Sequence, residues 1–260
     1  FYKYLHRVDG NLFFGKQGDG SNISLVEFET KSKKSRESTI IKLLHKKENV
    51  AEELFDRIGI RFVTHTKLDC LKLMHSLHQN YIIMVNNIKP SRSQNSLIDL
   101  DSFKTQHANL IKIGIKEKLS EEEFAKALDD LANECITSDY KGNSHTAKEY
   151  SAIHFTCREL IKYKNPFYQQ FLDMRSFAKA TTKESGEDSE ITKRLLDLDT
   201  NTIAKDIRFF YPFEIQITDK ESHKENSDGD ASHNEYKKSQ LVSAQQRLFS
   251  TLIEYTASKS

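Results

Sequence analysis

The sequence predicts an α/β (α+β) fold in which helices flank a mixed β-sheet, and three observations carry this prediction. Residues 213–218 alternate apolar and polar side chains with period two, as a half-buried strand does. Residues 46–85 follow a helix, strand, helix, strand pattern, which is typical of an α/β unit. Only three prolines and nine glycines occur in 260 residues, which disfavours a loop-built or low-complexity protein.

Composition limits the classes of function. Charged residues make up 30% of the chain, yet the formal net charge is only +1, so a basic binding site has to be local. No apolar run reaches the roughly 18 to 20 residues of a membrane span, and the first residues do not resemble a signal peptide. Cys70, Cys135 and Cys157 are widely spaced, which favours neither a zinc site nor a disulfide framework. We therefore expect a reducing, cytoplasmic environment and no membrane partner.

The first third of the chain alternates extended and helical patterns. Asn49 is a candidate cap for one helix, and Leu68, Leu71, Met74 and Leu77 lie near one stripe of the next. The expected elements are a hairpin of residues 12–14 and 23–28, a helix over 46–55, a strand within 56–64, a helix from about 68 to 77, and a strand over 81–85.

The remainder of the chain contains a second set of patterns. Ser120 followed by three glutamates predicts a capped helix that runs to about residue 135. Residues 148–163 alternate again, which places Tyr150 and His154 on one face of a strand. Residues 181–188 favour a polar loop, and residues 240–255 form an amphipathic terminal helix.

Three separated motifs resemble one protein family. One begins with Glu214-Ile215-Gln216-Ile217 and continues through His223 to Gly229, Ala231, His233, Tyr236 and Lys237. It resembles the end of the synthetase domain of RelA/SpoT-type alarmone synthetases, where an E-[VI]-Q-I-R-T strand precedes a helical segment and G-x-A-x-H-x-x-Y-K. Residues 56–61 are similar to the family's D-[IL]-x-[GA]-x-R motif. Residues 149–154 resemble G-Y-x-S-L-H and keep its Tyr and His.

The resemblance implies a fold and a reaction. The fold is a mixed sheet related to the DNA polymerase β-like nucleotidyltransferases. It would form a single domain over residues 1–260, with insertions at about 99–148 and 164–206 and a C-terminal helix at about 239–256. The reaction is the transfer of pyrophosphate from ATP to the 3′-hydroxyl of a guanosine (or adenosine) nucleotide. The implied partners are ATP with GDP, GTP or an AMP-type acceptor, and the implied cofactor is Mg²⁺.

The expected site residues follow from these motifs. Glu214 is the candidate proton acceptor, and Asp56 and Glu214 are the candidate catalytic and metal-ligating carboxylates, since Mg²⁺ prefers hard oxygen ligands. Asp56 and Arg61 line one site only if the strand begins after Asp56. The expected nucleotide-binding residues are Lys46, Lys47, Arg61, Tyr150, His154, Gln216 and His233.

The chain also departs from the family pattern. His45-Lys46-Lys47-Glu48 stands near the family's R-x-K-S, Thr218-Asp219 replaces R-T, and Ser227 replaces a glutamate. Losing an arginine weakens phosphate binding, because lysine is only a point charge where arginine grips two oxygens. Two alternatives therefore stay open beside the pyrophosphokinase. One is a transferase acting on an RNA 3′ end, steered by basic residues in 31–36 and 89–92. The other is a catalytically inactive nucleotide sensor or interaction domain. The oligomeric state is also open.

Overall fold

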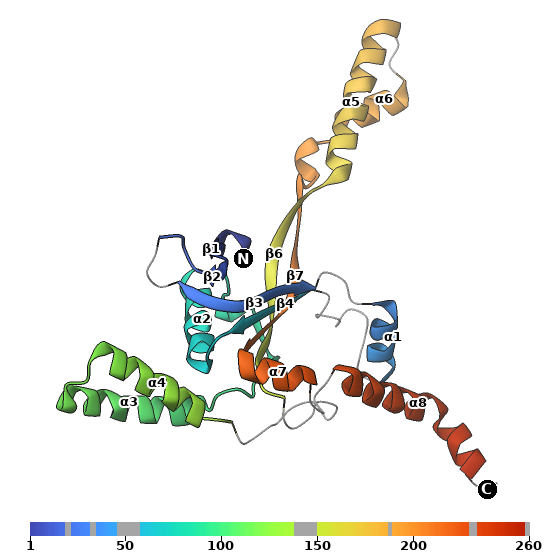
Figure 1. Ribbon diagram of the computed structural model, residues 1–260. Helices are drawn as coiled ribbons and strands as arrows, with labels where there is room; N and C mark the ends of the chain where they lie inside the picture. The colour runs from blue at the N-terminus through green and yellow to red at the C-terminus, as the bar shows by residue number, and fades with distance from the viewer. Residues whose placement is uncertain are drawn as a thin grey trace. The chain divides into compact units, whose positions relative to one another are not determined.

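The computed structural model describes residues 1–18, 22–31, 35–45, 58–137, 150–186, 189–228 and 233–257. The chain divides into two compact units (Figure 1). The first comprises Phe1–Arg158 and Pro212–Ser260, and the second comprises Glu159–Tyr211. Two long strands, β6 (Ile153–Lys164) and β7 (Asp206–Asp219), begin or end in one unit and continue into the other.

The secondary structure alternates strands and helices along the chain, as the sequence pattern predicts. Short 3₁₀ helices cover Tyr2–Tyr4, Val85–Asn87 and Thr200–Thr202. The remaining elements are β1 (Leu5–Val8), β2 (Asn11–Phe14), β3 (Ile23–Lys31), α1 (Arg36–His45), β4 (Gly59–Thr64), α2 (Lys67–Gln79), β5 (Ile88–Asn95), α3 (Leu100–Glu117), α4 (Glu121–Glu134), α5 (Pro166–Ser185), α6 (Glu190–Asp197), α7 (Lys220–Asp228) and α8 (His233–Ala257).

The described strands form one seven-stranded mixed sheet in the order β1-β2-β3-β4-β7-β6-β5. The pairs β1/β2, β2/β3, β3/β4 and β5/β6 are antiparallel. β4 and β7 are parallel and in register from Gly59 opposite Glu214 to Thr64 opposite Asp219. The protein is thus a mixed α/β structure, as expected, and the parallel β4/β7 pair lies at the centre of the sheet.

The core occupies one face of this central pair. Phe62, Ile215 and Ile217 are completely buried there, and α2 packs against the sheet (Figure 1). Leu73 and Leu77 of α2 are completely buried in the same core. Burying these aliphatic and aromatic side chains removes apolar surface from water, which is the main term that holds the sheet and α2 together. Cys70 of α2 lies in the same core and contacts Thr64 of β4 (Sγ to Oγ1, 3.0 Å), and burial raises the pKa of its thiol to about 12.

Several of the expected elements are confirmed. The 12–28 hairpin is formed by β2 and β3, the strand at 213–218 lies within β7, and the terminal helix lies within α8. α4 begins with a complete capping box, in which Ser120 and Glu123 exchange side-chain and backbone hydrogen bonds. These bonds from Ser120 lower the pKa of the Glu123 carboxyl.

Other expectations about local structure are wrong. No strand forms over 81–85, because the backbone amides of Ile82 and Ile83 donate to the carbonyl of Leu77 and wrap the end of α2. The strand begins at Ile88 instead. The polar loop expected over 181–188 is helical as far as Ser185, and α5 ends at Gly186 with φ +69°.

Two strand boundaries also differ from the expected ones. β6 begins at Ile153, so Tyr150 precedes the strand. β7 begins at Asp206, before the strand expected over 213–218, so Pro212 lies inside the strand, at the boundary between the two units. The helix expected over 46–55 lies outside the described residues.

A helical pair lies in each of the two regions expected to be insertions, as far as their residues are described. α3 and α4 pack against each other within residues 99–148. α5 and α6 pack against each other in the second unit, where the guanidinium of Arg175 donates to the carbonyls of Leu196 (2.8 Å) and Leu198 (3.0 Å). Elsewhere in the first unit α1 packs on α8, and Arg247 donates to the carbonyl of Leu44 (2.8 Å). None of the described helices combines the length and apolar character needed to cross a lipid bilayer.

Candidate functional site

The second face of β3, β4 and β7 is polar, and a β-bulge in β3 makes it so. Leu25 pairs with Thr64, but Glu27 pairs with Val63, so Val26 is an extra residue in β3. Such a bulge reverses which residues face the core. As a result Leu25 is buried with the core, whereas Glu27 and the alternate residues after it lie on the other face.

Strand register arranges this face into three rows that run across β3, β4 and β7. The rows are Lys31-Gly59-Glu214, Glu29-Arg61-Gln216 and Glu27-Val63-Thr218. The middle row contains two polar contacts, and the two outer rows contain residues whose side chains contact other elements. Because Gly59 has no side chain, β4 contributes no side chain to the first row, between Lys31 of β3 and Glu214 of β7.

Arg61 is the central cation of the polar face. Its Nε donates to Oε1 of Gln216 at 2.9 Å, and its Nη1 lies 3.3 Å from Oε2 of Glu29. The Arg61 side chain is about one-third exposed. Two partners on the neighbouring strands therefore fix the orientation of the guanidinium while part of it faces solvent.

Glu214 and His154 form the second polar contact. Oε1 of Glu214 lies 3.3 Å from Nε2 of His154 on β6, and both side chains are about 30% exposed. The backbone amide of Glu214 donates to the carbonyl of Ile58 (2.8 Å), which ties the start of β4 to this carboxylate. The contact with His154 involves one carboxylate oxygen of Glu214 and leaves its other oxygen for a ligand.

Acidic residues outnumber cations on this face. Glu27 lies 3.7 Å from Nε2 of His223 on α7, and Lys31 lies 3.7 Å from Glu29. Among the described residues of the three rows, the carboxylates of Glu27, Glu29 and Glu214 face two lysine or arginine cations, Lys31 and Arg61. A divalent cation or a positively charged group of a ligand would balance the difference.

Thr218 and Asp219, which replace the family's R-T, have structural contacts. Thr218 is 2% exposed, and its Oγ1 donates to the carbonyl of Ser151 (3.2 Å) just before β6. Oδ2 of Asp219 accepts from the amides of Glu221 and Ser222, which caps the first turn of α7. Position 218 is therefore enclosed and does not present a side chain to a ligand.

The expected site residues fall into three groups. Glu214, Gln216, Arg61 and His154 come together on the polar face through the contacts above. Tyr150 lies before β6, and its carbonyl accepts from Ser96 Oγ (2.8 Å). The other expected residues lie outside the described side chains: Lys46, Lys47, Asp56 and His233, of which only the backbone of His233, at the start of α8, is described.

Sequence reasoning missed Glu27, Glu29 and His223. Glu27, Glu29 and Lys31 recur at every second position, and this period-two signal could have placed them on one face. The signal was obscured because Ile23 and Leu25 continue the same period-two series but are apolar and face the core. The bulge between Leu25 and Glu27 moves the later members of the series to the other face.

The polar face offers carboxylate oxygens, the kind of ligand that Mg²⁺ prefers, but the described residues provide only part of a ligand set. Among the described residues no group of three or more His, Cys, Asp or Glu side chains is arranged to hold a metal. Mg²⁺ is commonly bound by one or two carboxylates, with water and substrate phosphates completing the octahedron. Glu214 provides one such carboxylate, and Asp56 precedes Gly59, the strand partner of Glu214, by three residues in sequence.

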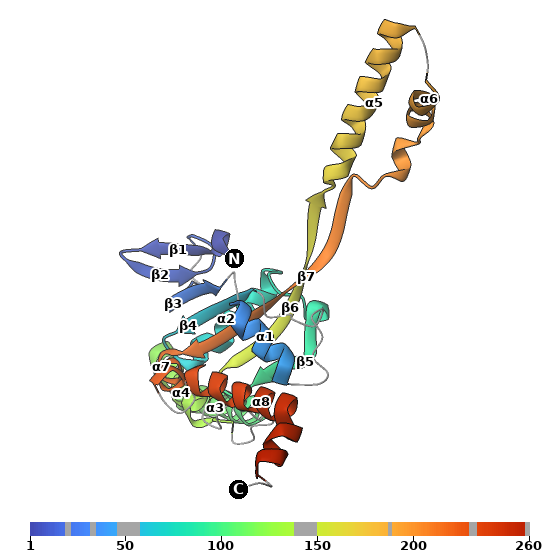
Figure 2. The ribbon, with the colours of Figure 1, turned by 90° about the vertical axis from the view of Figure 1, so that its right-hand side faces the viewer.

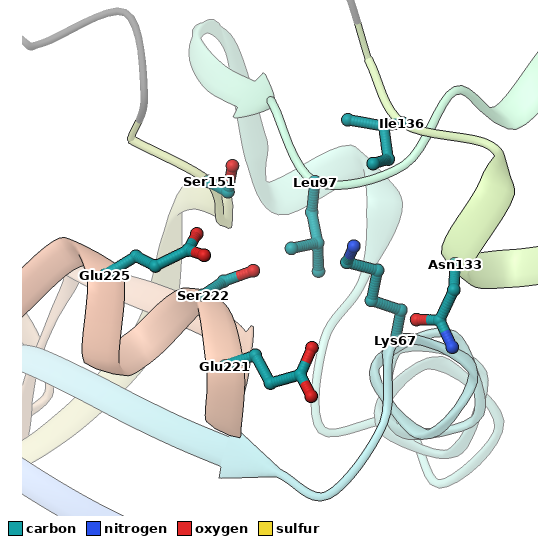
Figure 3. Close-up of a pocket in the computed structure, with 8 residues that line it drawn as sticks. All are labelled: Lys67, Leu97, Asn133, Ile136, Ser151, Glu221, Ser222 and Glu225. Carbon is teal, nitrogen blue, oxygen red and sulfur yellow. The ribbon is translucent and has the colours of Figure 1, made fainter.

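A separate hollow lies where the parallel strands β4 and β7 end (Figure 3). Its volume is about 380 Å³, and the carboxylates of Glu221 and Glu225 from α7 point toward it opposite Lys67 of α2. Neither Glu214 nor Arg61 lines it. The remaining lining residues are Leu97, Asn133, Ile136, Ser151 and Ser222.

Comparison with known proteins gives no assignment. No model of a protein family matches the chain, and no curated protein matches it either.

Proposed function

We propose that this protein is an Mg²⁺-dependent pyrophosphokinase of the nucleotidyltransferase fold, which transfers pyrophosphate from ATP to the 3′-hydroxyl of a guanosine or adenosine nucleotide. One observation carries the proposal. Glu214 and Gln216 of β7 and Arg61 of β4 share one face of a parallel strand pair, and these are the residues through which the sequence resembles alarmone synthetases.

The proposed step balances with the groups on this face. The 3′-hydroxyl oxygen of the acceptor attacks the β-phosphorus of ATP, the bond from that phosphorus to the α,β-bridging oxygen breaks, and AMP leaves with the electron pair. The hydroxyl proton passes to Glu214, whose second carboxylate oxygen is the acceptor. His154, 3.3 Å from the first oxygen, positions Glu214 for this transfer.

Charge on the transferring group has to be met by cations, because phosphoryl-type transfer depends mostly on positioning and electrostatics. Arg61 lies two residues along β4 from Gly59, the strand partner of Glu214, and Lys31 lies in the same row as Glu214. Mg²⁺, when bound by Glu214 and Asp56, would neutralise the phosphates further. The positive charge of the ion would also balance the excess of carboxylates on the polar face.

One alternative is favoured by a specific observation. Arg61 is already paired with Glu29, and the buried Thr218 replaces an arginine of the family. Both features lower the affinity for phosphate, so a nucleotide-binding domain without transfer activity is the second candidate. It predicts nucleotide binding with no labelled product.

The test is a transfer assay with labelled ATP and Mg²⁺. GDP, GTP, AMP and tRNA serve as separate acceptors, which also covers an RNA 3′ end. We expect the native protein to label one acceptor and Glu214→Gln to be at least about 100-fold slower, the usual scale for loss of a general base. Glu159→Gln, at an exposed carboxylate of the second unit, is the matched control and keeps the native rate.

Two outcomes would contradict the proposal. Equal transfer by the native protein and Glu214→Gln would remove Glu214 from the mechanism. Binding of ATP by the native protein without transfer to any of the four acceptors would favour the inactive alternative.

A further inference from the structure

The second unit, Glu159–Tyr211, has almost no interior of its own. Among its described residues only Ala178 is buried. A unit of this size normally depends on a buried apolar core to offset the entropy lost on folding. Eleven of its large apolar side chains are instead exposed: Leu160, Ile161, Tyr163, Phe167, Met174, Phe177, Ile191, Leu198, Ile207, Phe209 and Phe210.

Helix α5 carries three of these side chains, which form the α5 stripe (Figure 2 shows α5 and α6). Phe167, Met174 and Phe177 are 71%, 57% and 75% exposed. Their spacing of seven and then three residues puts them on one side of the helix, as in the seam of a helix pair. Arg175 projects toward the end of α6 and bonds its carbonyls, so α6 leaves the stripe uncovered.

The strand segments of the unit are apolar on both faces. Leu160 and Ile161 are neighbours on β6, and Phe209 and Phe210 are neighbours on β7, so each pair places one apolar side chain on either face. Two strands alone are marginally stable in water. The β6 and β7 segments of the second unit therefore need another apolar surface to cover their side chains, as α5 does.

We propose that the second unit is the surface through which two copies of this chain associate, with the α5 stripe of each copy at the centre of the contact. The charges of the unit suit a second copy. Residues 159–211 contain nine Lys and Arg against nine Asp and Glu, so two copies meet without net repulsion. The same balance gives no attraction to a polyanion or to an anionic membrane.

The exposed apolar area is also sufficient. An aromatic side chain can bury about 150–250 Å², so the eleven bulky side chains, which are roughly half exposed, offer on the order of 1,000 Å² per copy over all sides of the unit. One side supplies roughly half of this area, and only about 56–58% of a typical interface is apolar. A stable interface of standard size buries about 800 Å² per partner. A two-fold contact lets the same patch cover itself in both copies, which is the commonest arrangement in homodimers.

The test is the mass of the full chain in solution, measured by light scattering and sedimentation over a wide range of concentrations. The native protein is expected at twice 30.1 kDa. The double variant Phe167→Ser/Phe177→Ser is expected at the monomer mass. The matched control is Ile113→Ser/Ile115→Ser, which removes two exposed apolar side chains from α3 in the first unit and keeps the dimer.

Other results would overturn the proposal. These are a native protein that is monomeric at every concentration, a Phe167→Ser/Phe177→Ser variant that remains dimeric, or a control that dissociates equally. If the double variant loses helical circular dichroism, a Met174→Cys variant decides instead. Its new thiol is oxidised to test for a disulfide between two copies, and the three native cysteines do not interfere because they are buried. A cross-linked dimer supports the proposal, and a monomer under the same conditions contradicts it.

Discussion

The two faces of the β4/β7 strand pair share one backbone and one register but have opposite chemistry. On one face Ile60, Phe62, Ile215 and Ile217 are at most 7% exposed and pack in the core. On the other face Arg61, Glu214 and Gln216 are only half-buried and contact each other or side chains on neighbouring strands. Period-two alternation alone separates the two sets.

This difference separates stability from chemistry. Apolar burial contributes roughly 1.5–3 kcal/mol for each large side chain, whereas half-exposed ion pairs contribute about 0–1 kcal/mol because solvent screens them. Changes on the core face should therefore lower the free energy of unfolding. Changes on the polar face should affect ligand binding and transfer while leaving stability almost unchanged.

The largest expected effect on stability comes from Phe62→Ala. Phe62 is fully buried and its ring contacts those of Phe14 and Phe28, so the truncation leaves a cavity. We expect the free energy of unfolding, measured with urea, to fall by about 3–5 kcal/mol. Ile115→Ala is the control, since Ile115 is 75% exposed, and it should stay within about 0.5 kcal/mol of the native value. A loss below about 1 kcal/mol at Phe62 would mean that this face is not the core.

Arg61→Met tests the polar face and should reverse the pattern. The change removes the contacts with Glu29 and Gln216, but all three side chains reach solvent, so we expect stability to change by less than about 1 kcal/mol. If Arg61 binds phosphate, the lost charge-assisted hydrogen bond of about 1.5–3 kcal/mol should lower transfer roughly 10- to 100-fold.

The control for Arg61 is Arg194→Met, which breaks an exposed pair with Glu190 (2.7 Å) in the second unit. Transfer should be unaffected by that variant. Equal losses in the two variants, or a native rate in Arg61→Met, would separate Arg61 from the reaction.

The sequence predicted the central strand and its two faces because alternation is a local signal. Phe213, Ile215 and Ile217 are buried as that pattern requires. The capped helix after Ser120 was equally local, since a capping box involves residues three apart. Arg61 and Gln216 were expected in one site only because of the family resemblance, and their contact was not predicted, since 155 residues separate them.

The remaining features depend on tertiary contacts that no local pattern specifies. Residues 81–85 have the composition of a strand, but the amides of Ile82 and Ile83 donate to the carbonyl of Leu77 at the end of α2. The bulge at Val26 depends on pairing with β4, so the residues Glu27 and Glu29 could not be assigned to the site from β3 alone. The same holds for Thr218, whose partner Ser151 lies 67 residues away.

Thr218→Val gives the smallest effect and tests one of the two enclosed positions on the polar face, the other being the buried Val63. Thr218 belongs to that face by register yet is enclosed, and its hydroxyl joins β7 to the segment entering β6. Valine keeps the shape but loses the donor. The carbonyl of Ser151 still accepts from Asn226 Nδ2 (2.9 Å), so it is not left unsatisfied. We therefore expect a loss of about 1 kcal/mol in urea unfolding, the net value of one hydrogen bond.

Thr105→Val, at an exposed helical threonine, should be nearly neutral. A loss near 3 kcal/mol would instead show that position 218 depends on its hydroxyl as a buried network does, and no loss would place it with the apolar core.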